Sequence, residues 1–187
     1  MKKIKKKRRD THPAIDEPTD ILGQGYNAAT HTRIIVMGDA GELRGMYVDR
    51  KTRPKDQQGL FPLNFLAASY FMSTVGLLMS GPDAARVTQP ENLTLEDPPP
   101  GYDHLVSSGP PDGIKLYGAR LTDKTFFIGI GPDFASTKGE SFTFGDLQVC
   151  GAALQEAMLA VMPEEDRERA QEMAALLREA AEEGQLN

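Results

Sequence analysis

Three closely spaced glycines make Arg33–Asp49 the first segment to test for chemistry. They stand at positions 38, 41 and 45, within the run G-D-A-G-E-L-R-G. A phosphate-binding P-loop needs a lysine directly after its last glycine and a helix that follows at once. No lysine follows Gly41 or Gly45, and two acidic residues, Asp39 and Glu42, would repel phosphate. The segment is therefore predicted to be a β-hairpin with GDAG as its turn.

The other residue types that carry chemistry are scattered. His12, His31 and His104 lie far apart, and none has a second metal ligand at helical or hairpin spacing. The chain has no G-x-S-x-G nucleophile motif. The single cysteine, Cys150, lies in an apolar helical pattern and is predicted to be a buried structural thiol, with a lone nucleophile as the alternative. We therefore expect no catalytic residue, metal or cofactor, and a protein that is not an enzyme.

Charge is distributed very unevenly along the 187 residues. Residues 1–9 carry seven Lys or Arg, whereas residues 10–187 hold 14 basic against 27 acidic residues, a net charge of −13. An acidic body repels nucleic acid, so we expect no sequence-specific nucleic-acid binding. The basic arm 1–9 is either a solvated tail or a contact for an acidic partner or an anionic surface. No apolar segment of the signal-peptide kind follows it, which favours a cytoplasmic location.

The most apolar stretch of the chain is Leu63–Ser80. It is long enough to raise the question of a membrane span, but Asn64 and several hydroxyl residues dilute it and Gly76 interrupts it. Pro62 fits the first turn of a helix. The stretch is therefore predicted to be a soluble helix covered on most sides by its own sheet and by something else.

The remaining segments complete an α+β pattern. Residues 10–30 read as a lead-in with little structure, and residues 50–59 and 132–141 read as polar loops. The proline-rich residues 82–113 leave room only for a short strand near Leu105–Val106. Residues 114–131 have the alternation of a second hairpin, and a helix is predicted from Phe144 to Met162. Pro163 begins an added acidic helix, with Met173, Leu176, Leu177 and Ala180 on one face.

These predictions divide the chain into three parts. Residues 1–30 are the basic arm and lead-in, residues 31–162 are a single α+β domain, and residues 163–187 are the C-terminal acidic helix. The acidic helix either lies on the domain or binds a partner.

The order of elements resembles the roadblock/dynein light chain family over residues 33–162. The first hairpin, the helix LNFLAASYFMSTVGLLMS and the later hairpin with its closing helix carry the likeness. The resemblance implies a roadblock, longin or profilin-like antiparallel sheet of about five strands, with a crossing central helix and a closing helix. The long proline-rich loop and the helix after Pro163 depart from the family pattern.

The resemblance also implies a function. It points to a non-enzymatic dimeric adaptor or regulator of a small Ras-like GTPase, of the polarity, motility or trafficking type. The alternative is a structural or assembly component of a large complex, such as a phage particle or a secretion machine. A small enzyme or ligand sensor is a third possibility, which the missing catalytic groups disfavour.

The central helix is also the predicted contact with a partner. A helix that is apolar on every side needs a second cover, which a homodimer or heterodimer would supply. The small residues beside two aromatic residues favour close helix approach and a buried anchor. The predicted interface residues are Phe65, Ala67, Ala68, Ser69, Tyr70, Phe71 and Met72.

Overall fold

The computed structural model describes residues 20–51, 59–80, 93–109 and 114–169, and the fold is α+β. The first four strands form one antiparallel sheet in the order β1-β2-β3-β4. Their bounds are β1 Asp20–Asn27, β2 Thr32–Asp39, β3 Glu42–Arg50 and β4 Gly59–Pro62. None of the helices in these described ranges has both the length and the apolar character that crossing a membrane requires.

The later strands form a second antiparallel sheet in the order β5-β6-β7-β8-β9. The helix α1 (Phe65–Ser80) precedes this sheet, and α3 (Phe144–Val161) follows it. The strand bounds are β5 Leu93–Glu96, β6 Tyr102–Ser108, β7 Lys115–Leu121, β8 Phe126–Gly131 and β9 Lys138–Phe142.

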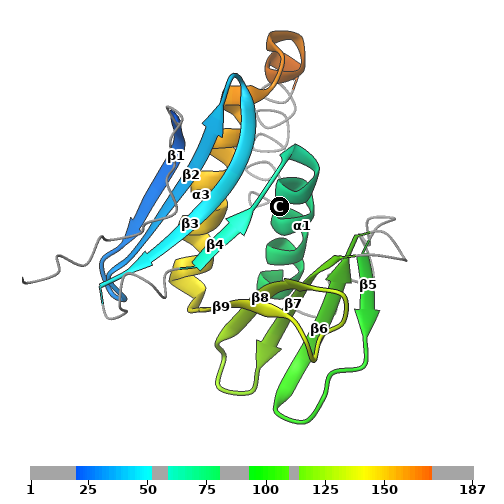
Figure 1. Cartoon of the computed structure of the whole chain (residues 1–187). Coiled ribbons are helices and arrows are strands. Elements are labelled where there is room, and N and C mark those ends of the chain that lie inside the picture. The colour runs from blue at the N-terminus through cyan, green and yellow to red at the C-terminus, as the bar shows by residue number, and fades with distance from the viewer. Residues whose placement is uncertain (1–19, 52–58, 81–92, 110–113, 170–187) are drawn as a thin grey trace, which may run out of the picture.

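Each of the helices α1 and α3 packs mainly on the sheet that does not directly precede it in the chain, an arrangement that we call the exchange of helices. The helix α1 follows the four-stranded sheet in sequence but packs on β5, β6 and β7, whereas α3 follows the five-stranded sheet and packs back on β1, β2 and β3 (Figure 1). The two helices also contact each other. Consequently one cluster of buried side chains contains residues of both sheets and both helices.

The two predicted hairpins are confirmed. Residues Ala40 and Gly41 connect β2 to β3, with φ values of 49° and 80°. Two consecutive residues at positive φ make the type of tight turn that matches the twist of a hairpin. The second hairpin joins β7 to β8, where the Asp123 carboxylate accepts bonds from the backbone N–H and hydroxyl of Thr125 at 2.9 and 2.6 Å. The predicted helices over 63–80 and 144–162 are confirmed within two residues of their ends.

The prediction of one sheet of about five strands is wrong, because the strands before and after α1 lie in two separate sheets. The lead-in 10–30 was predicted to have little structure, but its residues 20–27 form β1 and extend the folded domain to Asp20. The polar segment 132–141 contains most of β9, and β5 and the full length of β6 were also missed.

The start of α1 also differs from the prediction. Pro62 does not open the helix but ends the short strand β4. The helix begins two residues after Leu63, and the Asn64 side chain accepts a hydrogen bond from the backbone N–H of Ala67 at 2.8 Å. Asparagine is one of the preferred residues for capping the free N–H groups of a first helical turn.

Several predictions fall wholly or partly outside the described residues. These are the basic arm 1–9, the lead-in up to residue 19, parts of the proline-rich loop and the acidic helix beyond residue 169. Residues 164–169 are helical, as predicted for the segment that follows Pro163.

Candidate protein-binding surface

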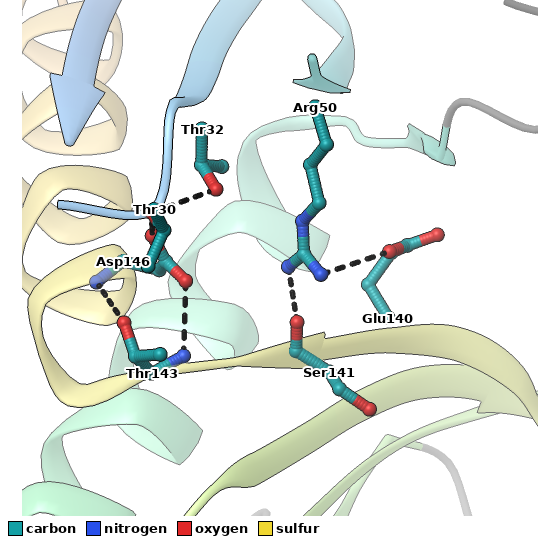
Figure 2. Close-up of polar contacts among 7 residues, drawn as sticks. All are labelled: Thr30, Thr32, Arg50, Glu140, Ser141, Thr143 and Asp146. Atoms are coloured by element: carbon teal, nitrogen blue, oxygen red, sulfur yellow. Dashed lines mark hydrogen bonds and ion pairs between the residues drawn. The ribbon is translucent and has the colours of Figure 1, made fainter. Parts of the chain in front are cut away.

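The most densely bonded polar group lies at the start of α3 (Figure 2). The Asp146 carboxylate accepts hydrogen bonds from Asn27 Nδ2 at 2.7 Å, Thr30 Oγ1 at 2.5 Å and the Thr143 backbone N–H at 3.0 Å. In return, the Asp146 N–H donates to Thr143 Oγ1 at 3.2 Å, which completes a capping box. The cluster therefore fixes the β1–β2 connection to the first turn of α3.

The electrostatics of Asp146 agree with a structural role. Burial on its own would raise the pKa of this carboxyl, but hydrogen bonds from Thr30, the Thr143 backbone and Asn27 together lower it. The side chain is only 2% exposed. The hydrogen bonds of this carboxylate therefore connect α3 to Thr143 and to the β1–β2 connection.

A second polar contact ties the two sheets together (Figure 2). Arg50, at the end of β3, donates from Nη2 to the Ser141 carbonyl of β9 and lies 4.0 Å from the Glu140 carboxylate. Its guanidinium carbon is 5.4 Å from the centre of the Phe142 ring. Arginine is well suited to this position because its planar group both bonds to oxygen and stacks on an aromatic face.

The metal-ligand residue types and the single cysteine are the other side chains that could carry chemistry. Within the described ranges, no three His, Cys, Asp or Glu side chains gather where a metal ion could be held. Cys150 is fully buried against Met46, with Sγ 3.2 Å from Sδ, and burial raises the pKa of its thiol. The prediction of a buried structural thiol is therefore confirmed.

The predicted interface residues of α1 fall into three groups. Ala68 and Phe71 are fully buried within the chain's own core. Phe65 is exposed, as is the neighbouring Leu66. Ala67, Ser69, Tyr70 and Met72 are half-buried. The cover that α1 requires comes largely from the five-stranded sheet and α3 of the same chain.

The five-stranded sheet has cover on both faces. One face packs on α1, and the other carries a small cluster of Leu105, Tyr117 and Ala119. Phe134, from the loop between β8 and β9, lies over this cluster with ring centres 5.3 Å from Tyr102 and 5.9 Å from Tyr117. A loop residue thus closes the face that the helix leaves open.

The four-stranded sheet differs, because the described residues cover only its inner face. Its outer face carries Ile35, Tyr47 and Leu60 in one row across β2, β3 and β4. The next row runs from Ile21 through Met37 and Gly45 to Pro62. Ile21 and Leu60 are 57% and 58% exposed. We call this surface the open face and define it by Ile21, Gln24, Ile35, Met37, Tyr47, Leu60 and Pro62.

Charges of both signs border the open face at each end. At one end, Arg33 of β2 lies opposite Asp49 of β3 in the strand register. At the hairpin end, Arg44 is paired with Asp39 and Glu42 at 3.8 and 3.5 Å. The open face is thus an apolar strip with a polar rim of mixed sign.

The sequence predicted the hairpin of β2 and β3 but did not single out this surface. The alternation that was recognised covers residues 43–48 and sets Gly45 and Tyr47 opposite Met46 and Val48. Ile21 was missed because β1 was taken for part of an extended lead-in, and Leu60 was missed because the segment from Leu60 onward was assigned to the approach to the helix, with Pro62 in its first turn. The signal that was available for β4 is the apolar pair Leu60–Phe61, which directly follows the polar segment 50–59.

The described part of the chain is an α+β fold with two antiparallel sheets, α1 packed on the second sheet and α3 packed on the first, and an apolar sheet face that no other described element covers. Comparisons of the chain with protein-family models, with curated proteins and with solved structures found no match.

Proposed function

We propose that the protein is a non-enzymatic adaptor that pairs with a second copy of itself through the open face. The observation that carries this proposal is the apolar strip of Ile21, Ile35, Tyr47 and Leu60 on a sheet whose other face is fully covered. Sheets commonly bury such faces by packing on another sheet about 10 Å away. A large contiguous apolar patch on a soluble protein commonly marks an interaction site.

The rim charges favour a second copy as the occupant. A two-fold symmetric interface places the same patch against itself, so a rim of a single sign would be self-repelling. The rim of the open face instead carries Arg33 beside Asp49 and Arg44 beside two acidic residues. Each basic group can therefore meet an acidic group of the second copy.

The open face is a better candidate for the dimer contact than the middle of α1. Ala68 and Phe71, which lie at the centre of the predicted interface, are already fully buried in the single chain. A partner could reach them only if α1 separated from its sheet. The side chains of the open face are available without such a rearrangement.

A narrower proposal concerns the partner of the adaptor. The likeness of the first hairpin, the central helix and the closing helix to the roadblock/dynein light chain family supports a small Ras-like GTPase. The two-sheet topology is not the single crossed sheet that this likeness implied. Support for the GTPase therefore comes from the sequence resemblance alone.

The proposed pairing is tested by light scattering on the full chain at micromolar concentration. The wild-type protein should have twice the chain mass of 20.4 kDa. Leu60→Asp places a charge in the centre of the contact, where burying it unpaired should raise the dissociation constant by about two orders of magnitude. This variant should therefore have the mass of a single chain.

Ile114→Asp is the matched control, because Ile114 is 69% exposed and lies outside the open face. It introduces the same charge at another exposed apolar position and should leave the dimer intact. A wild-type mass of one chain, or equal loss of the dimer in both variants, would refute pairing through the open face.

A further inference from the structure

A histidine and an arginine lie opposite each other on neighbouring strands of the five-stranded sheet. The strands are β6 and β7 (Figure 1), and His104 and Arg120 are partners in their register. The Nδ1 atom of His104 and the Nε atom of Arg120 are both buried, and neither has a hydrogen-bond partner within the described part of the chain. We call these two side chains the His–Arg pair.

Arg120 lies on the face of the sheet that packs on α1. The preceding residue, Ala119, belongs to the small cluster on the other face, and successive side chains of a strand point to opposite faces. Gly118 supports the same assignment, because a Cβ atom added there would lie 2.3 Å from a methyl carbon of Thr74 in α1. Arg120 and Gly118 are two positions apart and therefore share the α1 face.

A β-bulge turns His104 to that same face. Tyr102 and Leu105 both pack in the cluster on the other face. The register of β6 and β7 shifts between Tyr102 and His104, so β6 has one extra residue at this point. Without the shift, His104 would point the same way as Tyr102. With it, His104 and Arg120 lie on one face, where directly opposite residues have Cβ atoms about 4.5–5.5 Å apart.

Among the described residues, Arg120 differs from the other arginines because its side chain has no polar partner in the protein. This is unexpected in a chain with 27 acidic and 21 basic residues. The other described arginines have these partners: Gln24 for Arg33, Asp39 and Glu42 for Arg44, Ser141 and Glu140 for Arg50, the Met162 carbonyl for Arg167, and Asp166 for Arg169.

The chemistry of the His–Arg pair fits an oxyanion. The Nε–H of an arginine and one Nη–H lie on the same edge of the guanidinium group, where both can donate to the oxygens of a phosphate or a carboxylate. The Nδ1–H tautomer of a histidine donates to a further oxygen. Such an occupant would satisfy two buried nitrogens that otherwise lose their hydrogen bonds to water without compensation. Both side chains are half-buried, so solvent reaches the pair.

We propose that the His–Arg pair binds an oxyanion, the group that phosphates and carboxylates have in common. Arg120 supplies the charge and two donors on one edge, and His104 supplies a third donor from the adjacent strand. The bound anion joins β6 to β7 on the α1 face. The site lies in the five-stranded sheet and does not depend on pairing through the open face of the four-stranded sheet.

The test follows the histidine signals of the full chain by NMR. The chain has three histidines, and the Cε1–H signal of His104 is assigned by its loss in His104→Gln. Inorganic phosphate, added at constant pH and ionic strength, should shift this signal along a saturable curve. The signal of His31, whose Nδ1 lies 2.8 Å from the Tyr26 hydroxyl oxygen, is the internal control and should not follow that curve. A second titration with acetate shows whether a carboxylate binds as well.

Arg120→Gln removes the charge and the donor edge. It should raise the dissociation constant for phosphate at least about tenfold, because charge-assisted hydrogen bonds are the strong ones. Lys115→Gln is the matched control, since it removes one positive charge from the other end of the same strand, on the opposite face. It should leave the dissociation constant unchanged. Arg120→Lys keeps the charge without the planar donor edge and should also bind phosphate more weakly.

Thermal unfolding gives an independent readout. Phosphate should raise the melting temperature of wild type and of Lys115→Gln but not that of Arg120→Gln, because a ligand stabilises only a folded state that binds it. Equal dissociation constants in wild type and Arg120→Gln would overturn the proposal. A His104 signal that responds to neither anion, or only in proportion to its concentration as His31 does, would also overturn it. The mass of the protein, which reports pairing through the open face, is measured separately and can fail independently.

Discussion

At the scale of single residues, Asp146 is the polar side chain on which most local structure depends. It caps α3 and holds the β1–β2 connection through Asn27 and Thr30. Its carboxylate is buried but has a lowered pKa, which means that the folded state stabilises the charged form. In the sequence, Asp146 is one of many acidic residues and nothing distinguishes it. In the structure, it joins the start of α3 to the β1–β2 connection.

Asp146→Asn should lower the free energy of unfolding by about 2 kcal/mol at pH 7, because the amide cannot accept from all of the donors that face the carboxylate. The effect should depend on pH. A group whose pKa is lowered by folding stabilises the protein above its unfolded-state pKa, and this contribution is lost as the pH falls through the folded-state value. Urea unfolding at pH 7 and at pH 3 measures the loss of stability and its dependence on pH.

The difference between wild type and Asp146→Asn should therefore shrink at low pH. Asp103→Asn, which changes an exposed aspartate of β6, is the control and should alter stability little at either pH. A difference between wild type and Asp146→Asn that stayed constant with pH would mean that the charge of Asp146 contributes nothing.

At the scale of elements, the close contact between β1 and α3 depends on small residues. A Cβ atom added to Gly23 would lie 2.1 Å from the Ala153 carbonyl oxygen of α3. One added to Gly25 would lie 2.4 Å from a methyl carbon of Val149. The glycines therefore let an edge strand lie directly against the helix.

Gly23→Ala should lower the free energy of unfolding by about 3 kcal/mol, because the backbone of α3 would have to move away from β1. Gly151→Ala is the matched control, since a Cβ atom there meets nothing within 4 Å. It lies inside α3 and should raise the stability by about 1 kcal/mol through its higher helix propensity. Thermal or urea unfolding of both variants is the measurement, and equal effects would contradict the proposed contact.

The position of each strand within its sheet explains which strands could be predicted from the sequence. The strands β2, β3, β7 and β8 lie inside their sheets and have strong alternation or continuous apolar runs. The four strands that were missed, β1, β4, β5 and β9, are the edges of the two sheets. Edge strands tolerate glycine, proline and charge, as in DILGQGYN, GLFP and KGESF, and such composition reads as loop.

At the scale of the whole molecule, the exchange of helices decides which surfaces remain free. Because α1 packs on the second sheet and α3 packs on the first, neither sheet has a complete core without the other half of the chain. Arg50 strengthens this connection by joining β3 to β9.

The exchange could not be predicted from local patterns, because it depends on contacts between distant residues, which are 34 positions apart for Thr74 of α1 and Ser108 of β6 and 104 positions apart for Cys150 of α3 and Met46 of β3. The sequence identified α1 correctly as a helix that needs a second cover. It did not reveal that the same chain provides most of this cover. As a result, exposed apolar side chains occur on the open face and at the start of α1, whereas Ala68 and Phe71 in the middle of α1 are buried.

Pairing through the open face is tested most directly at Met37, which lies in the second row of that surface, half-buried in the single chain. Dilute hydrogen peroxide oxidises accessible methionine to the sulfoxide. In wild type at micromolar concentration, Met37 should be oxidised several times more slowly than in Leu60→Asp, because the second copy covers it. Met72 of α1, read from the same digest, should be oxidised equally in both proteins. Equal rates at Met37 in the two proteins would contradict pairing through the open face.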